Sequence, residues 1–306
     1  MKKSSNPIKI IFTSPTLKYP PIGGPATRIF NSLIALSKIS EVHVLFQTPD
    51  DNIDNGKISK SHVNIFKYKK LLFQNTSSLP LLFQKIIDYL RLKYRGFWQK
   101  IVNFVWANQI VDYARKNNIK IIWFGFGNVS YDLIRYVRKI NPKLKLVCDT
   151  DSVWSRYVLR RIKFKKGTKK ISLIREEGKI KQLEEEKLTR LCDVVTAVSD
   201  VDKKYYVNIA KKKDKVKVKQ FSNVINPSAY KNVPTPLDIP SGDYIYMSGT
   251  FGSETPMEDA ACWFIEKAFP LLRRHLPNIK LLIVGISADW VLLKYKNRKN
   301  IIIKGW

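Results

Sequence analysis

Two carboxylates, Asp149 and Asp151, directly follow an apolar run that predicts a β-strand over residues 144–148. In doubly wound α/β sheets, ligands bind at the carboxyl ends of the strands. Carboxylates at that edge can hold sugar hydroxyls or balance the positive charge on a reacting sugar. We therefore predict Asp149 and Asp151 as catalytic residues. The alternative is that they cap the next helix.

A glycine pair, Gly23 and Gly24, lies between a predicted strand at 8–12 and a predicted helix that begins near Pro25. Glycine lets backbone N–H groups approach a phosphate at a helix N-terminus, where the helix dipole favours negative charge. Arg28, one turn into that helix, could reach the same anion. The alternative is a plain tight turn. The pattern is not G-x-G-x-x-G, which disfavours a nicotinamide or flavin site.

A second strand–turn–helix unit repeats this layout at 244–264. Its turn contains Thr250 and Gly252, which are candidates to bind a phosphate at the carboxyl end of a strand. The helix that follows starts with Glu258 and Asp259. Because these carboxylates would repel a pyrophosphate, we expect them to serve the helix dipole instead.

Ser199 ends a third apolar strand, VVTAV at 194–198. A serine in this place is a good N-cap for the following helix, whose first turn would contain Asp202. The capping role is favoured over a substrate-binding role.

The elements that position these residues predict a parallel α/β fold, because short β-branched runs alternate with stretches of helical period. Further strands are predicted at 42–47, 63–66, 119–124 and 216–221. Helices are predicted at 81–116, 129–140, 171–191 and 201–210.

A change in composition predicts the domain organisation. Residues 232–242, NVPTPLDIPSG, contain three prolines and read as a linker. Residues 1–231 would form a first Rossmann-like domain. After the linker the pattern restarts, with strands at 244–248, 279–285 and 300–304 and a helix at 257–275. Because the sequence then ends, we expect 243–306 to be an incomplete second domain.

The charge of the chain implies an anionic partner. Its 306 residues include 55 Lys and Arg against 25 Asp and Glu, a formal net charge of +30. A biased base composition of the genome accounts for part of this surplus. Without a helix-turn-helix, zinc, RNP-like or KH-like signature, specific nucleic-acid binding is disfavoured. The three cysteines and three histidines have no metal-ligand spacing, so no metal is expected.

Basic residues concentrate at 156–181, where eleven bases stand against two acids, and again in KKKDKVKVK at 211–219. Basic and apolar residues also mix upstream of residue 107. This pattern fits docking to an anionic membrane, and the alternative is an ordinary solvated exterior. No apolar run is long enough to span a bilayer or to form a secretory core. We therefore predict a cytoplasmic protein that is a candidate for peripheral binding at the inner membrane face.

In this order and spacing, the motifs resemble the retaining glycosyltransferases of the family 4 type. The resemblance is carried by 21–36, 149–156 with its DSVWS segment, 193–206, 247–264 with its GTFG turn and PMEDA, and LLIVG at 281–285. It implies a GT-B fold, in which an acceptor domain and a nucleotide-binding domain face each other across a cleft. It also implies transfer of a sugar from a nucleotide sugar to a glycan or lipid-linked acceptor, in polysaccharide or glycolipid biosynthesis, without a metal or other cofactor.

The resemblance also implies roles for particular residues. Gly23 and Gly24 correspond to a glycine loop that touches the donor, and Asp149 and Asp151 occupy the segment where many members have an acceptor-site histidine. Thr250 and Gly252 would begin the donor-side phosphate turn. The candidate acceptor-binding residues are Arg28, Ser152 and Ser199.

The sequence departs from the family pattern at the donor side. Thr250 and Pro256 stand where many members have an arginine and a lysine, and SNVIN at 222–226 lacks the family's proline and glycine. The paired glutamates that grip the donor in the family would lie beyond Trp306. These departures leave an alternative open, a non-catalytic acceptor- or membrane-docking module of a split glycosyltransferase.

Overall fold

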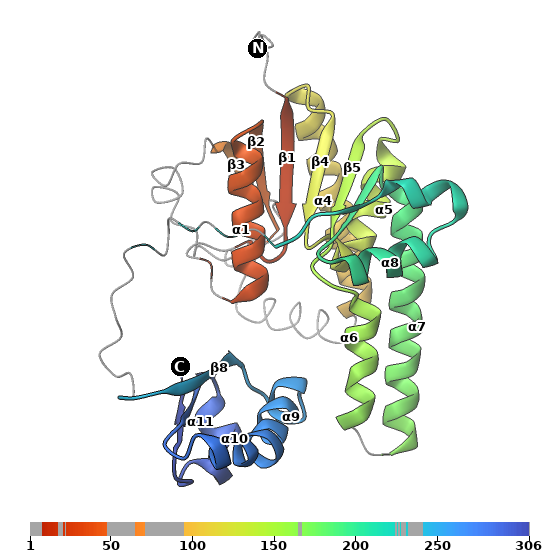
Figure 1. Cartoon of the computed structure of the whole chain (residues 1–306). Coiled ribbons are helices and arrows are strands. Elements are labelled where there is room, and N and C mark those ends of the chain that lie inside the picture. The colour runs from red at the N-terminus through yellow and green to blue at the C-terminus, as the bar shows by residue number, and fades with distance from the viewer. Residues whose placement is uncertain are drawn as a thin grey trace, which may run out of the picture. The chain divides into compact units, whose positions relative to one another are not determined.

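The computed structural model describes residues 8–17, 21, 23–47, 65–70, 95–164, 167–223, 225, 227, 231 and 241–305. The chain divides into two compact units (Figure 1). The first unit consists of Met1–Ser155 and Lys179–Pro227, and the second of Arg156–Gly178 and Ser228–Trp306. The second unit thus includes a segment, Arg156–Gly178, that we placed in the first domain. Most of the predicted linker at 232–242 lies outside the described residues, so the predicted domain limits stay a prediction.

The first unit contains a seven-stranded parallel sheet with the strand order β3-β2-β1-β4-β5-β6-β7. The strands are β1 (Lys9–Ser14), β2 (Glu41–Phe46), β3 (Ile65–Lys70), β4 (Ile121–Gly125), β5 (Lys145–Asp149), β6 (Val194–Ala197) and β7 (Val218–Gln220). The order reverses direction between β1 and β4. Such a switch point opens a crevice at the carboxyl ends of the strands in doubly wound folds.

Helices cover both faces of this sheet. They are α1 (Gly24–Ser37), α4 (Arg95–Lys116), α5 (Tyr131–Ile140), α8 (Asp200–Ile209) and the C-terminal part of α7 (Thr168–Leu191). A further helix, α6 (Trp154–Arg160), precedes α7 and falls mostly in the second unit. Alternate residues of β1 point to opposite faces, as the period of a strand requires. Ile11 packs in a core with α4, α5 and α8, whereas Ile10 and Phe12 pack in a core with α1.

The described part of the second unit contains a three-stranded parallel sheet with the order β10-β9-β8. Its strands are β8 (Tyr244–Thr250), β9 (Lys280–Ile286) and β10 (Ile301–Lys304), joined by α9 (Pro256–Trp263), the π-helical turn η5 (Phe264–Ala268), α10 (Phe269–His275), α11 (Ala288–Val291) and the 3₁₀ turn η6 (Leu293–Tyr295). Its core contains Leu281 and Ile283 of β9 packed with Ile265 and Phe269. The predicted helix at 257–275 is therefore present but contains one π-helical turn.

Most predicted elements are confirmed, with ends shifted by at most four residues. The predicted helix at 81–116 is described from Arg95 onward, and its first part lies outside the described residues. Sequence analysis missed α6, which is only seven residues long. Because isolated helices of this length are marginal in water, local pattern carries little signal for it. No described helix is long and apolar enough to cross a bilayer.

Helices α6 and α7 form a hairpin (Figure 1). They are joined by a 3₁₀ turn, η2 (Arg161–Phe164), and a short connection. A Cβ at Gly178 in α7 would come 2.5 Å from a side-chain carbon of Leu159 in α6, so any other residue here would require the Leu159 side chain to move. A glycine inside a helix costs about 0.5–1 kcal/mol relative to alanine. This contact explains why the hairpin tolerates one.

Candidate functional site

The carboxyl edge of the first sheet brings together most of the predicted site residues. Because β4, β5 and β6 are parallel and in register, Gly125 lies opposite Asp149, and Asp149 lies opposite Thr196. The N-terminus of α1 follows β1 at the same edge. This is the edge at which doubly wound sheets bind their ligands.

Asp149 is completely buried and accepts four hydrogen bonds. Its Oδ1 accepts from Arg28 Nη2 at 2.8 Å and from Thr196 Oγ1 at 2.6 Å. Its Oδ2 accepts from Arg28 Nη1 at 3.0 Å and from Trp123 Nε1 at 3.3 Å. All four carboxylate lone pairs are used inside the first unit. This geometry favours a positioning role for Asp149 over the predicted catalytic role.

Arg28 is only 3% exposed and forms the other half of this ion pair. It also donates to the carbonyl oxygen of Phe221 at 3.1 Å, and its guanidinium lies 5.5 Å from the centre of the Phe221 ring. Its Nε has no hydrogen-bond partner among the described residues, and Asp151 Oδ1 lies 4.0 Å from it. We expected Arg28 to contact an acceptor; its burial disfavours that role.

Hydrogen bonds hold the segment that leads from β5, through Asp149 and Asp151, to the start of α6. Thr150 Oγ1 donates to the Thr196 carbonyl at 2.6 Å. The Ser152 carbonyl accepts from Asn128 Nδ2 at 2.9 Å and from the Tyr206 hydroxyl at 3.3 Å. These contacts fix the course of the chain after β5.

A buried carboxylate, Glu185 of α7, holds the start of α6. Its Oε1 accepts from the Ser155 backbone N–H at 3.1 Å, and its Oε2 accepts from the Ser155 hydroxyl at 2.6 Å. The Tyr205 hydroxyl also donates to Oε2 at 2.7 Å. Because a helix N-terminus favours negative charge, Glu185 both caps and stabilises α6. Sequence analysis missed this residue and its partners.

Asp151 differs from Asp149, since its side chain is 22% exposed. Burial raises the pKa of the Asp151 carboxyl above its ordinary value, and the Arg28 guanidinium acts against this shift. The nearby carboxylates of Asp149 and Asp202 raise the pKa further. Asp151 is therefore the member of the predicted pair that can meet a ligand.

The glycine loop ends at a helix N-terminus whose N-cap residue, a glycine, offers no side-chain cap. Gly23 is the N-cap residue of α1 and has a φ of +84°, in the left-handed region that glycine adopts without strain. The first turn of α1 contains no acidic residue, and Pro25 lies at its start. The positive end of the α1 dipole is thus left for an anion.

The turn after β8 is built differently. Thr255 is the N-cap of α9, and its Oγ1 accepts from the Glu258 backbone N–H at 3.4 Å and donates to the Gly252 carbonyl at 2.7 Å. The Glu258 carboxylate accepts from the Glu254 backbone N–H at 2.6 Å. The prediction that Glu258 serves its helix is confirmed. The phosphate-binding role of Thr250 and Gly252 stays a prediction, since a carboxylate already lies at this N-terminus.

Ser199 is the N-cap of α8, and its hydroxyl accepts from the Asp202 backbone N–H at 3.2 Å. The favoured capping role is confirmed. Its acceptor-binding role and that of Ser152 stay predictions.

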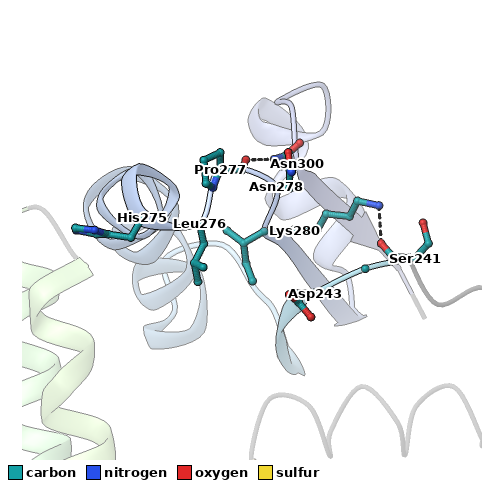
Figure 2. A pocket seen from close by; sticks show the side chains of 10 residues that line it. Ser241, Asp243, His275, Leu276, Pro277, Asn278, Lys280 and Asn300 are labelled. Atoms are coloured by element: carbon teal, nitrogen blue, oxygen red, sulfur yellow. Dashed lines mark hydrogen bonds between the residues drawn. The ribbon is translucent and has the colours of Figure 1, made fainter.

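A pocket in the second unit lies at the amino ends of its strands (Figure 2). Asp243, Lys280 and Asn300 line it, and these residues stand at or just before the amino ends of β8, β9 and β10. Lys280 Nζ donates to the Ser241 carbonyl at 2.8 Å. Because ligands of parallel α/β sheets bind at the carboxyl edge, this pocket is not assigned to the candidate site.

No protein-family model matches the chain, and no curated protein sequence matches it. Solved structures do match. The sucrose-phosphate synthase from Thermosynechococcus elongatus aligns with a TM-score of 0.60 and 12% identity, over 97% of this chain and 70% of that one. A glycosyltransferase from Rickettsia africae aligns with a TM-score of 0.57 and 15% identity, over 98% and 69%. A putative UDP-N-acetylglucosamine 2-epimerase from Listeria monocytogenes aligns with a TM-score of 0.50 and 13% identity, over 98% and 69%.

These matches identify the class of fold. The chain has a GT-B-like α/β fold with parallel sheets, and its coverage of the solved chains is consistent with one full domain and part of a second. The predicted fold class is confirmed. Because glycosyltransferases and epimerases both share this fold, the fold alone does not choose between their reactions.

Proposed function

We propose that the chain acts in the transfer of a sugar from a nucleotide sugar to a glycan or lipid-linked acceptor, with retention of configuration. The observation that carries this proposal is the pairing of the uncapped α1 N-terminus with Asp151 at the carboxyl edge of the first sheet. The first can stabilise a departing diphosphate and the second can bind a sugar hydroxyl. The similarity of the fold to a glycosyltransferase and a sucrose-phosphate synthase supports the proposal.

The residues of the candidate site divide into two groups in this proposal. Gly23 and Gly24 place backbone N–H groups and the α1 dipole beside the donor phosphate, and Asp151 orients a hydroxyl of the acceptor or of the transferred sugar. Asp149 and Arg28 are positioning residues, because their ion pair joins β5 to α1 and holds both parts of the site in place. No step in this scheme uses a metal ion, and no described group of three His, Cys, Asp or Glu side chains could hold one.

A nucleotide-sugar binding experiment tests the role of the glycine loop. Saturation-transfer NMR with a panel of UDP-, GDP- and ADP-sugars would identify the donor, and calorimetry would give its affinity. Gly23→Ala forces a Cβ into a left-handed φ, so we expect the affinity to fall at least about tenfold. Gly167→Ala is a matched control, since Gly167 also has a positive φ, of +96°, and open space around it.

The control separates strain from binding. Gly167→Ala should leave the affinity unchanged. An equal loss of affinity in both variants, or no binding of any nucleotide sugar by the unaltered chain, would contradict the proposed donor contact.

A second candidate function is a non-catalytic docking module that works with a separate donor-binding polypeptide. The observation that favours it is the Glu258 carboxylate at the N-terminus of α9, which disfavours a phosphate at the expected donor turn. Calorimetry distinguishes the two functions, because such a module should give no saturable heat with any nucleotide sugar but should still bind an acceptor glycan.

A further inference from the structure

The helical hairpin carries a large excess of basic residues. We call residues 156–181 the basic hairpin; it contains α6, η2 and the first part of α7, with eleven bases against two acids. One of the two acids, Glu177, accepts from Arg161 at 3.0 Å, and the bases exceed the acids in this segment by nine. The basic hairpin therefore presents a strong local excess of positive charge.

Aliphatic side chains lie exposed among these bases. Leu173 is 58% exposed and Ile180 is 49% exposed, and their spacing of seven residues puts them on one side of α7. Leu183, three residues further on, is 52% exposed and continues the same stripe. Lys169 and Lys179 are exposed beside them. The opposite side of α7 is buried, with Ile174 at 5% and Glu185 at 1% exposure.

We propose that the basic hairpin docks on an anionic phospholipid surface. Lysine and arginine side chains near the membrane are attracted to its acidic headgroups. Exposed aliphatic side chains between them enter the boundary between headgroups and acyl chains. Nucleic acid would satisfy the charges but has no hydrocarbon layer to cover Leu173 and Ile180. The combination of charge and aliphatic surface therefore favours lipid.

This inference goes beyond the sugar transfer proposed above and does not depend on it, because membrane binding needs neither donor nor acceptor. It also specifies which part of the basic surface would bind the membrane. Net charge alone would give diffuse attraction over the whole surface, whereas a docking surface requires that particular lysines matter more than others.

Vesicle flotation tests the location directly. The full chain would be mixed with vesicles of phosphatidylcholine alone or with vesicles that also contain about 40% phosphatidylglycerol, an anionic lipid. The salt concentration would be ~150 mM, close to physiological ionic strength. The triple variant Lys169→Glu, Lys170→Glu and Lys179→Glu should lower binding to the anionic vesicles at least about tenfold. The matched control Lys211→Glu, Lys212→Glu and Lys213→Glu makes the same charge change at three other exposed lysines. It should lower binding less than about threefold.

A second pair of variants tests the aliphatic contribution. Leu173→Ser with Ile180→Ser should weaken binding several-fold, whereas Leu271→Ser with Leu293→Ser, at two other exposed leucines, should not change it. Equal losses in the two lysine variants would overturn the proposal in favour of diffuse charge. Absence of binding to anionic vesicles would also overturn it, as would a duplex oligonucleotide that binds the hairpin more tightly than the vesicles do.

Discussion

The two sheets use the same strand–turn–helix unit in different surroundings. In the first sheet, β1 pairs with β2 on one side and β4 on the other, and five of its six residues are buried. In the described part of the second sheet, β8 pairs only with β9, and none of its seven residues is buried. A parallel strand is normally covered on both faces. β1 is therefore held by its neighbours in a way that β8 is not.

The helices that follow these two strands also begin differently. α1 has a glycine as its N-cap and no acidic residue in its first turn, whereas α9 has Thr255 as its cap and Glu258 in its first turn. A helix end that lacks its own cap is left to be satisfied by water or a ligand. The comparison thus indicates that the N-terminus of α1 is better suited than that of α9 to receive an anion.

The substitution with the largest expected effect is Arg28→Met in the first unit. The substitution leaves the Asp149 carboxylate buried without a cation, and we expect the first unit to lose about 3–5 kcal/mol of stability. Urea denaturation of the chain measures the loss. The double variant Arg28→Met with Asp149→Leu should recover part of it, because it removes both charges. A loss below 1 kcal/mol in the single variant would mean that the ion pair does not stabilise the first sheet.

A matched pair of core substitutions compares β1 with β8. Ile11 of β1 is fully buried, so Ile11→Ala should destabilise the first unit by about 2–5 kcal/mol. Ile245 of β8 is only partly buried, and Ile245→Ala should cost about 1 kcal/mol. Hydrogen exchange read at peptides from each strand locates the effects. Equal costs at the two positions would show that β8 is buried in solution as deeply as β1.

Acid should affect the two units unequally. Burial acts to raise the pKa of Asp193 in the first unit, but the Leu146 N–H, Arg138 and Lys145 outweigh it and lower the pKa overall. A lowered carboxyl pKa contributes stability above the unfolded-state value, and this is lost as pH falls below about 4. Asp193→Asn should therefore reduce the loss of stability at acid pH, seen as a flatter acid side of a plot of melting temperature against pH. The expected change in the free energy of unfolding is about 1 kcal/mol or less.

The second unit provides the control for this pH effect. A hydrogen bond from Tyr295 lowers the pKa of the Glu266 carboxyl, with smaller contributions from nearby bases. Glu266 is exposed, so Glu266→Gln should change the acid limb less than Asp193→Asn does. The opposite ranking would contradict the expected dependence on burial.

The smallest expected effect on stability is that of Asp151→Asn. Burial raises the pKa of Asp151, so its charged form is disfavoured in the folded chain. A raised carboxyl pKa contributes stability at low pH that is lost as pH rises through it. At neutral pH, Asp151→Asn should therefore leave the melting temperature unchanged or slightly higher while it weakens binding of an acceptor glycan measured by calorimetry. A clear drop in melting temperature would instead make Asp151 a structural residue.

Local sequence pattern was sufficient for the strands and for the sheet class, because buried parallel strands are short β-branched runs and the helices between them have a clear period. It also identified the edge of the sheet that carries the candidate site. It could not reveal that Asp149 pairs with Arg28, since 121 residues separate them in sequence. Thr196 and Glu185 were missed for a related reason. A polar residue inside an apolar strand, or one acid among several in a helix, shows its role only when its distant partner is known.

The course of α7 has a consequence for any attempt to separate the two units. This helix runs unbroken from Thr168 to Leu191, yet the boundary between the units falls within it, after Gly178. The chain therefore passes between the units three times, after Ser155, after Gly178 and after Pro227. A single cut after Pro227 would leave residues 156–178 attached to the first unit and would remove them from the second. To obtain a first unit free of the second unit's residues, residues 156–178 would have to be replaced by a short connection and the chain cut after Pro227.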